Sequence, residues 1–189
     1  MKSLRQNPGL IVLFLLFSAS LALNVALGWR LKASAGPAAP SPGGVQKESV
    51  LPEMAVRDVN GGAVTVTFDA SRPTILYVLS PACSWCDRNH ANIAALSSSP
   101  KTAQYRFVGL STTGKGLADY VKTKGLPFPV FHVDSEELIT TLGLYATPQT
   151  VLVEKGGRVE RVWVGAWDKK QQAEIESFFG VMVPGMQAP

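Results

Sequence analysis

Residues 74–86 read TILYVLSPACSWC and contain the only two cysteines of the 189-residue chain, Cys83 and Cys86. The first six positions form an almost continuous apolar run, which is typical of a strand buried on both faces. The segment from Ser84 to about Ser97 then has the apolar positions of a helix. The sequence therefore predicts a buried strand, a short turn, and a helix that begins at the cysteine pair.

The Cys-x-x-Cys spacing favours redox chemistry over a structural disulfide. A bridge that staples a fold stabilises more when it closes a long loop, and this one closes almost none. A cysteine at a helix N-terminus faces unpaired backbone N–H groups, so its pKa commonly falls to about 3.5–7.5. We therefore expect Cys83 to be the nucleophile that attacks a partner disulfide and Cys86 to resolve the mixed disulfide.

Metal and haem sites are the alternatives for the same cysteines. Cys83, Cys86 and His90 have the spacing C-x2-C-x3-H, and His132 would have to be the fourth zinc ligand. Structural zinc normally has a second close pair of Cys or His ligands, so zinc is the weaker hypothesis and His90 is expected on an exposed helix face. Covalent c-type haem attachment needs His directly after the second cysteine, where this chain has Asp87.

The remaining pattern alternates between strands and helices. Strands are expected near residues 64–68, 105–110, 150–154 and 159–164, with a short extended piece at 129–133. Helices are expected near residues 116–124, 135–142 and 169–179, and Ser135 is expected to cap the second of them. Strand–helix–strand units followed by a hairpin and a last helix predict an α/β fold with a mixed central sheet.

The N-terminal region predicts a membrane anchor. Residues 10–29 carry no charge, and about twenty such residues cross a hydrocarbon core of roughly 30 Å as a helix. A cleaved signal peptide, cut near residues 33–35, is the alternative, but its apolar part is usually shorter, and here Arg30 follows the run directly. The short tail with Lys2 and Arg5 is expected in the cytoplasm. In a bacterium, the rest of the chain would then lie in the periplasm, held at the inner membrane by a single span.

The chain divides into five parts on composition. We expect a tail at 1–9, the anchor at 10–29, an Ala/Pro/Gly-rich linker at 30–47, a folded domain at 48–183 and a tail at 184–189. The net charge of +4 comes from the first 47 residues, which hold five of the 18 basic residues and no acid. The remainder has 13 basic and 14 acidic side chains, so nucleic-acid binding is not expected.

Four motifs of the chain resemble the thioredoxin superfamily and, more narrowly, the TlpA/ResA-like membrane-anchored thiol–disulfide oxidoreductases. They are Cys83-Ser84-Trp85-Cys86 after a buried strand, Phe128-Pro129-Val130 followed by Asp134, Tyr145-Ala146-Thr147-Pro148, and a hairpin turning at Gly156-Gly157. The resemblance covers residues 50–180 and implies a three-layer fold in which Pro148 is cis and faces the disulfide. It also implies that the Thr147 backbone pairs with a substrate segment.

The resemblance further implies a function. It points to a protein-disulfide reductase without metal or organic cofactor, whose catalytic residues are Cys83 and Cys86. Its partners would be periplasmic protein disulfides, apocytochrome c among them, and a membrane thiol carrier that supplies electrons. Trp85, between the two sulfurs, is expected to contact the partner protein.

Three positions depart from the familiar pattern. Ala82 stands directly before the first cysteine, where many relatives have an aromatic residue. Tyr77 stands where thioredoxins keep a buried Asp, and Asn89 where the haem-maturation branch often has Glu. Neither carboxylate is therefore available near the second cysteine, and Asp87 is expected to face solvent.

Two other functions compete with the reductase hypothesis. A peroxiredoxin needs Thr three residues and Pro seven residues before its reactive cysteine, and this chain has Ser80 and Leu76 there. A non-catalytic assembly or metal-binding module at the membrane is the alternative from a different class. It predicts a cysteine pair that stays reduced or binds zinc.

Overall fold

The structure is a computed structural model that describes residues 8–33, 44–68 and 71–187. It has two compact units, Met1–Ala39 and Pro40–Pro189. Within the first unit, solvent exposure is described for Gly9 and residues 11–26. The expected tail at 1–9 and linker at 30–47 therefore fall largely outside the described residues.

The first unit contains one helix, α1 (Pro8–Ala33), of 26 residues. Its large apolar side chains are exposed from Ile11 to Val25. Among the residues whose side chains the structure describes, no helix is both long enough and apolar enough to cross a membrane.

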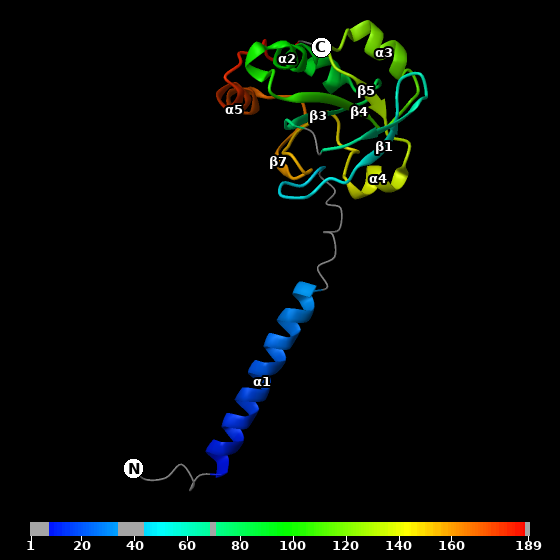
Figure 1. The fold of residues 1–189 in the computed structure, drawn as a ribbon. Helices are drawn as coiled ribbons and strands as arrows, with labels where there is room; N and C mark the ends of the chain where they lie inside the picture. Colours follow the sequence, from blue (N-terminus) through cyan, green and yellow to red (C-terminus); the bar gives the residue numbers. More distant parts are fainter. Residues whose placement is uncertain (1–7, 34–43, 69–70, 188–189) are drawn as a thin grey trace. The chain divides into compact units, whose positions relative to one another are not determined.

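The second unit is built on a mixed sheet of seven strands in the order β2-β1-β5-β4-β3-β6-β7 (Figure 1). In chain order the strands are β1 (Met54–Arg57), β2 (Ala63–Val66), β3 (Thr74–Leu79), β4 (Arg106–Ser111), β5 (Val130–His132), β6 (Gln149–Val153) and β7 (Val159–Val164). All six residues of β3 are buried, because this strand lies inside the sheet between β4 and β6. The predicted buried strand is confirmed.

The pairing makes the sheet mixed, as predicted. Strand β3 pairs parallel with β4 and antiparallel with β6, and β6 continues into an antiparallel hairpin with β7. Strand β4 pairs parallel with β5, whose other edge is covered by the antiparallel pair β1 and β2. Parallel strands joined through helices need both faces of the sheet covered.

Helices cover both faces and complete three layers. One hydrophobic cluster contains residues of α2 (Ser84–Ser98), α3 (Leu117–Lys124) and α5 (Lys169–Phe179), together with the alternate positions Ile75, Tyr77 and Leu79 of β3. The other contains α4 (Glu136–Thr141) with the opposite positions of β3, Leu76 and Val78. In Figure 1, α2, α3 and α5 accordingly lie on one side of the sheet and α4 on the other.

Local signals explain where the helices begin and end. The Ser135 hydroxyl accepts a hydrogen bond from the backbone N–H of Leu138, so it caps α4 as predicted. Asp168 and Gln171 form a reciprocal capping box at the start of α5. Gly125 ends α3 with a positive φ of 58°, a conformation that costs glycine little. A short 3-10 turn, η2 (Pro100–Thr102), follows α2.

The structure adds three features to the predicted domain. Strand β1 was not predicted, and it forms a hairpin with β2 through a turn that contains Asn60 and Gly61. Val45 is already buried, and its backbone N–H bonds to the Gln149 side chain, so packing begins before the expected start at 48. At the other end, the backbone N–H of Gln187 bonds to the carbonyl of Arg88, so part of the expected tail is docked on α2.

Candidate active site

Cys83 and Cys86 form a disulfide across the first turn of α2. Cys83 is the N-cap residue, with extended backbone (φ −92°, ψ 103°), and Cys86 lies one turn into the helix. The backbone N–H of Cys86 points at Cys83 Sγ over 3.1 Å. The helix N-terminus therefore directs a backbone donor and the positive end of its dipole at the Cys83 sulfur, and both favour a thiolate there.

The two cysteines differ in accessibility. Cys83 is partly exposed, whereas Cys86 is fully buried in the cluster between the sheet and α2. A partner sulfur can therefore approach Cys83 from solvent, whereas Cys86 is closed to solvent and bonded to Cys83. The geometry suits the expected division into attacking and resolving cysteine.

Trp85 presents an aromatic surface beside the disulfide. Its side chain is 49% exposed, and the Arg88 guanidinium lies over its ring, 4.5 Å from the centroid. Arg88 Nε in turn donates to the Gln187 carbonyl at 3.1 Å. Residues 184–189 were expected to form a tail, but Gln187 of this segment bonds to Arg88. The Arg88 guanidinium in turn covers one face of the Trp85 ring.

Asp87 is half exposed but does not stand alone. Its carboxylate pairs with Lys124 of α3 at 2.8 Å. Burial raises the pKa of Tyr120, also on α3, and the neighbouring Asp87 carboxylate raises it further. Asp87 therefore joins α2 to α3 through an ion pair that leaves its charge compensated.

Thr147 and Pro148 precede β6 and follow α4. Their peptide bond is cis, as the resemblance implies. The register of β3 against β6 ends at Val78 paired with Gln149. Pro148 therefore lies one step further along, at the end of β3 that leads into the cysteine turn, and its carbonyl accepts from the N–H of Gly165 at 2.8 Å.

Gln149 is a buried residue that sequence reasoning missed. Its Nε2 donates to the carbonyls of Gly143 and Ala146, and its Oε1 accepts from the N–H of Val45. The Gln149 side-chain amide thus connects the loop before Pro148 to Val45 at the start of the domain through hydrogen bonds. The available signal was a polar side chain opening a strand that is otherwise apolar.

The inner face of α2 also carries polar groups. Asn89 is fully buried one turn after Cys86, and Tyr77 of β3 is 2% exposed. Trp167 connects the region, because its backbone N–H bonds to Asn89 and its ring N–H to Thr150. Sequence reasoning identified Asn89 and Tyr77 only as departures from a pattern, and Trp167 not at all.

The zinc alternative gains no support from the described residues. Residues 8–33, 44–68 and 71–187 contain no group of three or more His, Cys, Asp or Glu side chains that could hold a metal ion. His90 is partly buried rather than exposed as expected. His132 packs at the end of β5, where a Cβ on Gly114 would come within 3.1 Å of its Nδ1.

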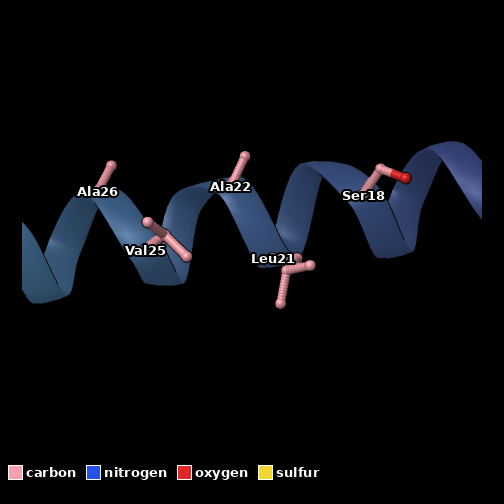
Figure 2. Close-up of a pocket in the computed structure, with 5 residues that line it drawn as sticks. All are labelled: Ser18, Leu21, Ala22, Val25 and Ala26. Carbon is pink, nitrogen blue, oxygen red and sulfur yellow. The ribbon is translucent and has the colours of Figure 1, made fainter.

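A pocket on the first unit is separate from these residues. Ser18, Leu21, Ala22, Val25 and Ala26 line it, and all five belong to α1 (Figure 2). Because a single helix supplies the whole lining, the pocket is a hollow on the surface of α1. It includes none of the redox residues.

Comparison with known proteins identifies the fold. No protein-family model matches the sequence, and no curated protein matches it. Among solved structures, StoA from Bacillus subtilis matches with a TM-score of 0.52 and 16% identity, over 67% of this chain and 98% of that one.

Two further solved structures resemble this chain. The thioredoxin domain of a thiol-disulfide oxidoreductase from Bacteroides vulgatus matches with a TM-score of 0.59 and 15% identity, over 71% of this chain and 99% of that one. A thiol-disulfide isomerase from Corynebacterium glutamicum matches at 0.56 and 18%, over 70% and 94% of the two chains. At these identities the likeness shows the fold, which is thioredoxin-like.

Proposed function

We propose that this protein is a thiol–disulfide oxidoreductase that exchanges disulfides with other proteins through Cys83 and Cys86. One observation carries the proposal: the disulfide spans the N-terminal turn of α2 with one sulfur partly exposed and the other fully buried. A bridge of this size adds little stability, whereas this position activates a thiolate. The likeness of the fold to solved oxidoreductases supports the same class.

The exchange proceeds in two balanced steps when the protein acts as a reductase. The Cys83 thiolate attacks a substrate disulfide, so a mixed disulfide forms and one substrate thiolate leaves and takes up a proton. The Cys86 thiol then loses its proton, and its sulfur attacks Cys83 Sγ. The Cys83–Cys86 bond forms, and the second substrate sulfur leaves as a thiolate that is protonated. The protein dithiol is oxidised, and the substrate disulfide is reduced.

Three residues around the disulfide are proposed to bind the substrate. Trp85 offers a half-exposed ring beside the reactive sulfur. Thr147 and Pro148 lie at the end of β3 that leads to the cysteines, where an extended substrate segment would meet the Thr147 backbone. Such backbone pairing holds a substrate in register without selecting its side chains.

The direction of electron flow is proposed to be reductive. The resemblance to TlpA/ResA-like proteins supports it, and by that resemblance a membrane thiol carrier would return electrons to the pair. Substrates would be disulfide-bonded periplasmic proteins, with apocytochrome c as one candidate. Because the potential of the pair against its compartment decides the direction, thiol trapping in cells is the direct test. A largely reduced pair supports the reductase, and a largely oxidised pair supports an oxidase.

A single-pass anchor in the bacterial inner membrane is proposed for residues 10–29. Its support is the uncharged stretch itself and the short basic tail before it. The folded domain would then work in the periplasm. Fractionation of cells that express the full chain tests this: release of the protein by osmotic shock would contradict the anchor.

Reduction of insulin by dithiothreitol tests the activity. The purified protein should accelerate it, Cys83→Ser should abolish the acceleration, and Cys86→Ser should accumulate a mixed disulfide with the substrate. Equal rates for the protein and Cys83→Ser would reject the enzyme. A stoichiometric zinc content in that case would support the binding module.

A further inference from the structure

The side chains of Asn89 and Tyr77 hold buried donors that are not fully satisfied. Among residues 8–33, 44–68 and 71–187, neither Asn89 Nδ2 nor Tyr77 Oη has a partner at ordinary hydrogen-bond geometry, and both atoms are inaccessible to solvent. The Asn89 amide is near enough to the Tyr77 hydroxyl to act on its pKa as a hydrogen-bond donor, and this contact leaves the Tyr77 proton and the second Nδ2 proton without an acceptor. A buried polar group without a partner costs about 1–3 kcal/mol, so such a pair needs an explanation.

The orientation of the Asn89 amide is fixed by its other end. Its Oδ1 accepts from the backbone N–H of Trp167 at 3.2 Å and from Asn92 Nδ2 at 3.0 Å. A backbone N–H can only donate, so the oxygen must lie on that side and Nδ2 on the opposite side. Asn89 is therefore held with its donor turned away from Trp167.

The Tyr77 hydroxyl remains protonated over the working pH range. Burial raises its pKa far above the ordinary value, while the amide of Asn89 lowers it by a smaller amount. Asp87 of α2 and Tyr120 of α3 each raise it further. Tyr77 is thus a neutral group that can offer a proton in a hydrogen bond but cannot act as a base.

Cys86 lies on the side of the sheet that Tyr77 faces, one helical turn before Asn89. Cys86 and Asn89 are three residues apart on α2, so their side chains are neighbours on one helix face, and both are 0% exposed. Cys86 and Tyr77 belong to the same buried cluster. In the oxidised protein the Cys86 sulfur is bonded to Cys83 and carries no charge, so it is only a weak hydrogen-bond acceptor.

We propose that Asn89 Nδ2 and Tyr77 Oη form a neutral donor pair that stabilises the Cys86 thiolate when the disulfide is open. The inference rests on the proposed function, because only a redox-cycling Cys86 becomes a thiolate. In the resolving step, Cys86 gives its proton to solvent, and the second substrate sulfur takes up a proton from solvent when it leaves as a thiolate. The donor pair then stabilises the negative charge until the sulfur attacks Cys83 Sγ. Asn89 and Tyr77 are positioning residues in this step, and they exchange no proton.

The charged side chains near the donor pair are engaged with other partners, so the neutral donors are the groups assigned to stabilise the Cys86 thiolate. Asp87 on α2 is the charged group that acts on Tyr77, and it pairs with Lys124 on α3 at 2.8 Å. Arg88, also on α2, is turned to the Trp85 ring and to Gln187. His90 is partly buried on the same helix.

The test measures the pKa of the Cys86 thiol directly, without turnover. In full-length Cys83→Ser protein, ultraviolet absorbance of the thiolate is followed against pH, alone and combined with Tyr77→Phe or Asn89→Leu. Hydrogen bonds to a charged group contribute about 1.5–3 kcal/mol, so each substitution should raise this pKa by about one to two units. Thr102→Val removes a buried hydroxyl beyond the far end of α2 and should leave the pKa unchanged.

The outcomes separate this inference from the proposed function. An unchanged Cys86 pKa in folded Tyr77→Phe and Asn89→Leu proteins overturns the donor pair, whatever the activity of the parent. Tyr77→Phe keeps the ring and removes only the hydroxyl, so it remains informative if Asn89→Leu does not fold. If the pKa rises as expected but the parent protein does not reduce insulin, the donor pair stands and the oxidoreductase function fails.

Discussion

The backbone N–H of Trp167 donates a hydrogen bond to Asn89 Oδ1, 3.2 Å away and 78 residues earlier in the chain. The bond ties the segment that leads into α5 to the middle of α2. The Trp167 ring N–H extends the connection to Thr150 in β6. The active-site helix, the central sheet and the last helix therefore meet through one buried tryptophan.

Asn89→Ala should destabilise the oxidised protein by about 1–3 kcal/mol, because it leaves the Trp167 N–H buried without an acceptor. Urea unfolding with the disulfide intact measures the change. Gln104→Ala, at an exposed position, is the matched control and should change the unfolding free energy by less than about 0.5 kcal/mol. Equal stabilities of the two variants would show that the bond contributes nothing.

Local sequence patterns predicted the elements around the cysteines well. The apolar run at 74–79, the cap at Ser135 and the hairpin between β6 and β7 each have a short-range cause, and all appear in the structure. Strand β1 was missed because Met54–Arg57 has only four residues and its pattern is weak by itself. The Asn60-Gly61 dipeptide that follows is a hairpin signal that could have found it.

The supporting polar groups of the site could not be predicted in the same way. Gln149 bonds to Val45, 104 residues earlier, and Trp167 to Asn89. Contacts between residues so far apart in the sequence form only when the sheet is assembled, and they leave no periodic pattern in the sequence. The position of the Cys83–Cys86 disulfide at the start of a helix was predictable, because it depends on a strand, a turn and a helix that are adjacent in the chain.

Arg88→Met should free the Trp85 ring. It removes the guanidinium 4.5 Å from the ring and the bond to the Gln187 carbonyl. Cation–π contacts at exposed sites contribute about 0.5–1 kcal/mol, so global stability should change little while the ring becomes more mobile. Nitrogen relaxation of the Trp85 indole reports the mobility, and deletion of residues 184–189 should have a smaller effect in the same direction. Lys115→Met is the control, and a ring equally rigid in Arg88→Met would refute the contact.

Asp134 should contribute stability that disappears in acid. Its carboxylate bonds to Arg57 at 2.7 Å, and this bond holds the pKa of Asp134 below its ordinary value. Because the folded-state pKa is depressed, the contribution is present above the ordinary pKa of about 4 and is lost as the pH falls through the folded value. Asp134→Asn should therefore lower the urea midpoint at neutral pH and converge with the parent in strong acid. A constant difference at all pH values would contradict the ion pair.

Gln149→Glu should disrupt the loop before Pro148 more than Gln149→Leu does. The amide donates to two carbonyls, those of Gly143 and Ala146, and a carboxylate has no proton for either. It would also place a negative charge, 0% exposed, against those oxygens, and a buried charge without a partner costs several kcal/mol. We expect a loss of more than about 3 kcal/mol for Glu, a smaller loss for Leu, and a fall of insulin reduction in both. Gln104→Glu, at an exposed site, should match the parent, and a Glu variant as stable as the Leu variant would show that the amide protons of Gln149 are not needed.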